Sequence, residues 1–173
     1  MSDLSKFDCS VRNPSTIVTP WDRTDPIAFL DATPDDRRQW LCAIGLGRYA
    51  PFLAHLAKTP HNLTCVARFL RDPDRVKFPD LRGADLANLD LTDANLIRVQ
   101  LNQANLRGAI LHNADLIFAN FSHADLTGAD LRGATLNQTI WTATIVQRCD
   151  LRSAKGLTVS LSQALAAGGA IVD

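Results

Sequence analysis

Four residues of the types that bind zinc lie in one stretch of the N-terminal half of the chain. They are Cys42, His55, His61 and Cys65. Structural zinc sites usually hold their ligands in close pairs such as CxxC or HxxxH, and this stretch contains no such pair. We therefore expect these residues to belong to packed helices, with zinc binding as the minor alternative. We expect no metal ion and no cofactor in this protein.

Two further groups of residues are candidates for acid–base chemistry. His112 and His123 lie in the second half of the chain, where aspartates also recur at regular intervals. Regular recurrence indicates a structural role at chain turns rather than one catalytic pair of carboxylates. The sequence shows no Ser-His-Asp order, phosphate-binding loop or nucleotide-binding glycine motif. We therefore expect a protein that is not an enzyme, with both histidines on its surface.

An apolar residue recurs at every fifth position from residue 81 to residue 151. The fifteen positions are Leu81, Leu86, Leu91, Leu96, Leu101, Leu106, Leu111, Leu116, Phe121, Leu126, Leu131, Leu136, Trp141, Val146 and Leu151. A small residue, usually alanine, precedes most of these positions by two residues, and Asp or Asn directly precedes ten of them. A period of five fits neither an α-helix nor a β-strand. It predicts a chain that turns a corner every five residues and directs these apolar side chains inward.

This run resembles the pentapeptide-repeat proteins, whose motif is approximately Ala-(Asp/Asn)-Leu-X-X. Residues 124–134, with the sequence Ala-Asp-Leu-Thr-Gly-Ala-Asp-Leu-Arg-Gly-Ala, match the motif well. The resemblance implies a mainly β fold, a right-handed quadrilateral β-helix with four pentapeptides per coil, and therefore a solenoid of about four coils. The two ends of such a solenoid need caps.

The repeat divides the chain into four expected regions. These are an irregular or disordered arm (residues 1–26), a helical N-terminal cap (27–76), the pentapeptide-repeat β-helix (77–157), and a C-terminal capping helix with a tail (158–173). In the N-terminal cap, Thr33 followed by Pro34 is a strong helix start, and further helices fit at about 48–58 and about 62–71. Thr158 and Gly168 are suited to begin and end the C-terminal helix.

Residues 40–52, with the sequence Trp-Leu-Cys-Ala-Ile-Gly-Leu-Gly-Arg-Tyr-Ala-Pro-Phe, resemble the opening of a sterile-alpha-motif (SAM) domain. The later helices of that domain are missing, because the coils begin soon afterwards. We therefore interpret residues 27–76 as a helical cap on the solenoid. A reduced relative of the SAM domain is the alternative.

The outward positions of the solenoid are mostly polar or small, but one side differs. The side centred on Leu96, Leu116 and Leu136 presents the candidate interaction residues Ile97, Arg98, Ile117 and Phe118. Clustered apolar side chains at outward positions indicate a surface that something covers. Either the helices of the same chain cover it, or it binds an unidentified protein partner or a second copy in a homodimer.

The balance of acidic and basic residues limits the classes of partner that we expect. The sequence has 18 basic and 18 acidic residues, so we expect it to bind neither nucleic acid nor a membrane. We therefore favour a non-enzymatic protein-interaction or scaffold module. The alternative comes from the family resemblance, since some pentapeptide-repeat proteins mimic DNA and inhibit the type II topoisomerase DNA gyrase. That role needs an acidic rod, whereas residues 77–156 carry eight aspartates and eight basic residues.

Nothing in the sequence suggests export or membrane insertion. The first residues contain no basic stretch that leads into an apolar run, and no window of about 18 apolar residues exists. We therefore expect a cytoplasmic protein. The four cysteines, Cys9, Cys42, Cys65 and Cys149, are then expected to be free thiols.

Overall fold

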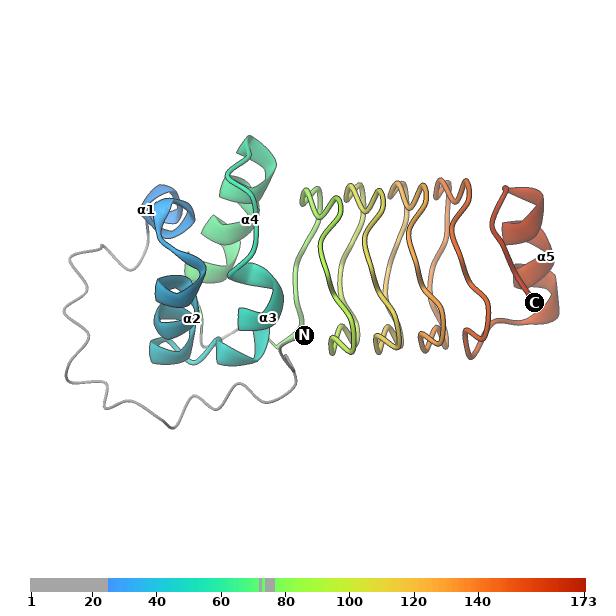
Figure 1. Cartoon of the computed structure of the whole chain (residues 1–173), viewed down its shortest axis with the longest axis horizontal. Helices are drawn as coiled ribbons and strands as arrows, with labels where there is room; N and C mark the ends of the chain where they lie inside the picture. The colour runs from blue at the N-terminus through green and yellow to red at the C-terminus, as the bar shows by residue number, and fades with distance from the viewer. Residues whose placement is uncertain (1–24, 72, 74–76) are drawn as a thin grey trace. The chain divides into compact units, whose positions relative to one another are not determined.

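The computed structural model describes residues 25–71, 73 and 77–173. The chain divides into two compact units between Lys77 and Phe78. Figure 1 shows helices in the first unit, and stacked coils followed by one helix in the second. The arm expected at residues 1–26 lies outside the described residues, except for Asp25 and Pro26. Within the described ranges, no helix combines the length and the apolar character that a membrane crossing requires.

Short helices joined by tight turns form the first unit. They are α1 (Pro26–Asp31), α2 (Pro34–Ala43), the 3-10 helix η4 (Gly47–Tyr49), α3 (Ala50–Leu53) and α4 (Pro60–Arg71). The predicted start of α2 is confirmed, because the Thr33 hydroxyl accepts a hydrogen bond from the Asp36 N–H at 3.2 Å. Phe29, Trp40 and Phe69 are buried among the core residues of this unit.

Arg37 is a charged residue at the centre of the helical unit, where it is only 8% exposed. Its guanidinium donates hydrogen bonds to the carbonyls of Ala54 (3.1 Å) and Leu56 (2.8 Å). It also donates to carbonyls at the end of α1. The prediction of a helix at about residues 48–58 is wrong in its length. The helical segment ends at Leu53, and Arg37 binds carbonyls that a longer helix would use internally.

In the second unit, parallel bridges join residues at every fifth position from Asp80 to Thr135 to the residues 20 positions later. Examples are Asp80 with Gln100, Gln100 with Asn120, and Asn120 with Ile140. The predicted inward positions are confirmed, because the series from Leu81 to Leu151 is buried with one exception. The exception is Trp141, which is half-buried near the end of the coils and stacks on Phe121 with ring centres 4.7 Å apart.

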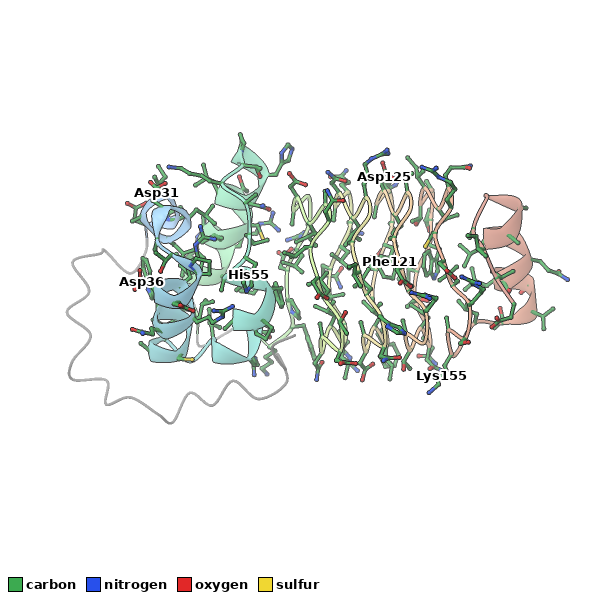
Figure 2. The ribbon with its side chains drawn as sticks, viewed as in Figure 1. Asp31, Asp36, His55, Phe121, Asp125 and Lys155 are labelled. Carbon is green, nitrogen blue, oxygen red and sulfur yellow. The ribbon has the colours of Figure 1, made fainter. Side chains whose placement is uncertain are left out.

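The corners of the coils explain the composition of the repeat. The N–H of Ala124 donates to the Phe121 carbonyl at 2.9 Å, and the intervening His123 has a positive φ of 61°. Asp125 begins the next corner, where its Oδ1 accepts a hydrogen bond from the Thr127 N–H at 2.9 Å. In Figure 2, Phe121 lies within the coils and Asp125 at their outer edge. An Asp or Asn that precedes an inward residue therefore stabilises the following turn.

The last part of the chain returns to the coils after a helix. Helix α5 (Val159–Ala167) begins after Thr158, whose hydroxyl accepts from the Leu161 N–H, and it has Gly168 at its C-terminal cap, as predicted. Beyond it, Ile171 forms a parallel bridge with Asp150. The Leu151 N–H donates to the Ile171 carbonyl at 2.8 Å. The tail therefore continues the hydrogen-bonding pattern of the coils on one side of the solenoid.

The cysteines differ from the expectation of four free thiols. Cys42 is disulfide-bonded, so the expectation is wrong for this residue. Cys65 and Cys149 are buried and not disulfide-bonded, and Cys9 lies outside the described residues. Spacing along a sequence cannot show which cysteines meet in space. Burial, followed by the nearby Asp150 and Asp130 carboxylates, raises the pKa of the Cys149 thiol to about 12, which disfavours the reactive thiolate form.

Candidate interaction surface

Three residues spaced 20 positions apart stack at one corner of the solenoid. They are Phe78, Arg98 and Phe118, which we call the aromatic–arginine column. The guanidinium carbon of Arg98 lies 5.2 Å from the ring centre of Phe78 and 5.0 Å from that of Phe118. Both distances are within the range of cation–π attraction. The column follows directly from the 20-residue pairing of the coils.

The column lies at the surface, beside two isoleucines. Phe78 is 45% exposed and Phe118 is 42% exposed, whereas Ile97 and Ile117 are half-buried. The Arg98 N–H donates to the Ile117 carbonyl at 2.8 Å, which joins the two corners. The four residues named from the sequence, Ile97, Arg98, Ile117 and Phe118, therefore lie at neighbouring levels of one corner.

Phe78 belongs to this surface, although sequence reasoning did not include it. The signal that could have found it is its position 20 residues before Arg98, which equals one coil. The repeat itself starts after Phe78, so this residue lies outside the pattern of inward positions.

Four other arginines of the solenoid pair with carboxylates. The pairs are Arg82 with Asp80 (2.7 Å), Arg107 with Asp125 (2.9 Å), Arg132 with Asp130 (2.6 Å) and Arg152 with Asp150 (2.6 Å). Arg98 makes no ion pair with any residue in the described part of the chain, and two aromatic rings flank its guanidinium instead. The column is therefore a site of positive charge that the solenoid does not neutralise.

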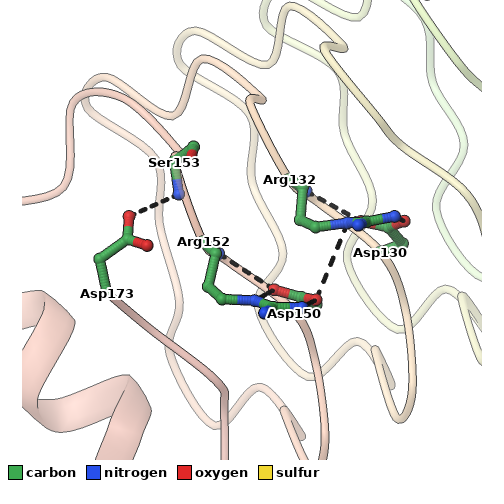
Figure 3. Close-up of polar contacts among 6 residues, drawn as sticks. All are labelled: Asp130, Arg132, Asp150, Arg152, Ser153 and Asp173. Carbon is green, nitrogen blue, oxygen red and sulfur yellow. Dashed lines mark hydrogen bonds and ion pairs between the residues drawn. The ribbon is translucent and has the colours of Figure 1, made fainter.

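Figure 3 shows the hydrogen bonds and ion pairs that Arg132 and Arg152 make with Asp130 and Asp150. The Nε and Nη2 atoms of Arg132 both donate to Asp130, and Nε also lies 3.8 Å from Oδ2 of Asp150. Arg152 donates to Asp150 in the same two-pronged way. The side-chain hydrogen bonds from Arg132 and Arg152 hold the pKa values of Asp130 and Asp150 below their ordinary range. These carboxylates are ionised structural acceptors rather than proton-transfer groups.

Within the described residues, the side chains considered for metal binding or catalysis are not grouped as a metal site would require. Among the described residues, no group of three His, Cys or Asp side chains is arranged to hold a metal ion. His55 Nε2 lies 2.6 Å from Nη2 of Arg38, and burial followed by the charges of Arg38 and Arg37 lowers its pKa. His123 is exposed at a corner, and His112 is half-buried.

Other outward apolar residues are spread around the coils. Ile110, Ile140 and Ile145 are 41%, 47% and 49% exposed. None of them is accompanied by a ring-stacked arginine in the described structure. The combination of charge and aromatic surface therefore distinguishes the aromatic–arginine column from the remaining apolar positions.

Comparison with known proteins gives a family match for the coils. The family model for pentapeptide repeats matches residues 80–113 and 109–152, with 8 copies. No curated protein matches the chain.

Several solved structures are similar to this chain. One is HetL, a pentapeptide repeat protein involved in heterocyst differentiation regulation from the cyanobacterium Nostoc sp. strain PCC 7120, at 33% identity and a TM-score of 0.36; the match covers 53% of this chain and 35% of HetL. A second is a pentapeptide repeat protein from the Arabidopsis thaliana thylakoid lumen, at 26% identity and a TM-score of 0.32, covering 54% of this chain and 74% of that protein. A third is QnrB1, a plasmid-mediated fluoroquinolone resistance protein, at 20% identity and a TM-score of 0.26, covering 54% of this chain and 60% of QnrB1.

Proposed function

Residues 80–152 form a pentapeptide-repeat domain, and we propose that this domain is a non-enzymatic module that presents a rigid surface to a protein partner. A solenoid of about four coils forms this surface. The observation that supports this proposal most strongly is the exposed aromatic–arginine column, with Ile97 and Ile117 beside it. Aromatic and arginine side chains are enriched among the residues that dominate binding energy at protein interfaces.

Rigidity supports the same proposal. The N–H groups of Arg98 and Phe118 donate to carbonyls of the following coil at 2.8 and 2.9 Å, so the backbone under the column is held on both levels. A surface that is already ordered loses little conformational entropy when a partner binds. The solenoid therefore supplies affinity through a small number of well-positioned side chains.

The proposed surface is tested by capturing partners with tagged full-length protein from the cell of origin. The test variant is Phe118→Asn, and the matched control is His123→Asn. Both residues lie at corners with φ of 61°, and asparagine tolerates this backbone conformation. We expect the control to capture the same partner as the wild-type protein and Phe118→Asn to lose it. Capture of the same partners by all three proteins would contradict the proposed surface.

The alternative function, inhibition of DNA gyrase by DNA mimicry, has weaker support. It needs an acidic surface, but the solenoid region has equal numbers of aspartates and basic residues. Asp80, Asp125, Asp130 and Asp150 are also paired with arginines. A neutral surface competes poorly with DNA for a basic groove. A gyrase supercoiling assay separates the two functions, since strong inhibition at low micromolar protein would favour the alternative.

A further inference from the structure

Two phenylalanine rings lie close to the exposed guanidinium of Arg98. The rings of Phe78 and Phe118 lie 5.2 and 5.0 Å from its central carbon, and each ring can attract the cation through its face. The N–H donors of a guanidinium lie in its plane and match the two oxygens of a carboxylate. Arg98 is exposed and forms no ion pair with the described residues, so its charge is available to a partner.

The corner that carries Arg98 and Phe118 has the left-handed backbone conformation that recurs throughout the repeats. Arg98 and Phe118 have positive φ values of 57° and 61°. The equivalent position holds glycine in some repeats, as at Gly108, and a non-glycine residue, such as His123, in others. A bulky aromatic residue is uncommon in this region of conformational space. Phe118 is 42% exposed, so burial in the solenoid core does not explain its presence at this position.

We propose that Arg98 binds a carboxylate in an acidic and apolar segment of the partner protein, with Phe118 and the two isoleucines contacting the neighbouring apolar side chains. This inference rests on the proposed function, because it assigns the chemistry of the partner that the aromatic–arginine column recognises. The charge supports it, since Arg82, Arg107, Arg132 and Arg152 already pair with aspartates of the solenoid. Arg98, by contrast, lies against two aromatic rings and has no paired carboxylate within the described part of the chain.

A protein carboxylate suits this site better than a nucleic acid does. Nucleic-acid binding depends on several basic residues that contact successive phosphates. Most arginines of the solenoid are already neutralised by aspartates, and residues 77–156 contain as many acids as bases. One free guanidinium beside apolar side chains is instead complementary to one acidic residue beside apolar residues.

The inference is tested by selecting random-sequence peptides that bind the full-length protein. We expect the selected peptides to carry Asp or Glu next to apolar residues. Binding of one such synthetic peptide should weaken by at least about tenfold in Arg98→Gln. Arg98→Lys, which keeps the charge but loses the two-pronged geometry, should restore only part of the affinity.

Arg148→Gln is the matched control. Arg148 is also exposed at a corner with a positive φ of 55°, and it forms no ion pair within the described structure, but no ring flanks it there. Its variant should bind the peptide as the wild-type protein does. Circular dichroism of each variant checks that the coils remain folded.

The possible outcomes distinguish a failure of this inference from a failure of the proposed function. Peptides without acidic residues, or equal binding by Arg98→Gln, would overturn the carboxylate assignment. If that binding still requires Phe118, the proposed surface stands. If it is indifferent to Phe118→Asn as well, both are wrong. A selection without binders counts against the carboxylate assignment, and the capture experiment then decides the proposed function. A single-stranded oligonucleotide that binds through Arg98 would also overturn the assignment in favour of nucleic acid.

Discussion

The guanidinium of Arg98 lies 5.0 Å from the ring centre of Phe118, a residue 20 positions later in the chain. This contact depends on the coil length, because parallel bridges throughout the solenoid join residues with the same separation. The repeat that buries the leucines therefore also aligns side chains on the outside. A functional surface arises from residues that are distant in sequence but equivalent in the repeat.

Neighbouring residues Leu116 and Ile117 provide a direct test of the inward and outward positions. Leu116 is completely buried, so Leu116→Asp places an unpaired charge in the core and should destabilise the solenoid by at least about 4 kcal/mol. Ile117 is half-buried, and Ile117→Asp should leave the coils folded while it disrupts partner binding. Thermal melting followed by circular dichroism measures both variants. Wild-type melting of Leu116→Asp would show that the register is wrong.

Gly156 should tolerate substitution less well than Gly128, although both have a positive φ (85° and 68°). A Cβ atom at Gly156 would lie 2.7 Å from the backbone nitrogen of Asn137, whereas nothing lies within 4 Å of a Cβ at Gly128. We expect Gly128→Ala to cost about 1 kcal/mol from the backbone alone. Gly156→Ala should cost about 2–4 kcal/mol, because steric overlap is added. Equal melting temperatures of the two variants would contradict the close approach of the coils at Gly156.

The solenoid should lose stability in acid. The pKa values of Asp130 and Asp150 are lowered, first by side-chain hydrogen bonds from Arg132 and Arg152. A carboxyl group with a lowered folded-state pKa stabilises the fold fully above its unfolded-state pKa of about 3.9, and the contribution is lost as the pH falls through the folded-state value. Urea unfolding between neutral pH and about pH 2 should therefore show falling stability. The double variant Asp130→Asn with Asp150→Asn should show a weaker pH dependence, and an unchanged dependence would contradict the assignment.

Arg37 should be essential for the helical unit. Arg37→Met leaves the carbonyls of Ala54 and Leu56 without these donors, and we expect a loss of about 3–5 kcal/mol. Lys58→Met is the control, since it removes an ion pair with Asp31 in which the side chains are 46% and 51% exposed, and it should cost less than about 1 kcal/mol. Hydrogen–deuterium exchange measured by mass spectrometry reports each unit separately. Equal exchange in both variants would contradict the role of Arg37.

The inward register of the coils could be predicted from the sequence because an apolar residue recurs at the same position in successive repeats. The positions from Leu81 to Leu136 were all identified correctly, and so was the C-terminal helix. The corner hydrogen bonds, such as that from Thr127 to Asp125, also follow from residue type. In these segments local propensity and burial favour the same structure.

Features that depend on contacts between distant segments were not predictable in this way. The role of Arg37 depends on carbonyls 17 and 19 residues away, and helical propensity alone extended the third segment too far. Phe78 joins the candidate surface only through its stacking on Arg98, outside the repeat. The disulfide bond of Cys42 likewise has no signal in the local sequence.

The most direct test of the aromatic–arginine column is disulfide trapping between Arg98→Cys and Phe118→Cys. Stacked coils place such residues about 4.8 Å apart, within the range of about 4.4–6.8 Å between Cα atoms that a disulfide bond spans. The control pair is Arg98→Cys with Asn113→Cys, which lies at a different corner and is not one coil away. The account predicts rapid oxidation of the first pair and none of the second. Crosslinking of the control pair, or failure of the first pair to crosslink in a folded protein, would contradict it.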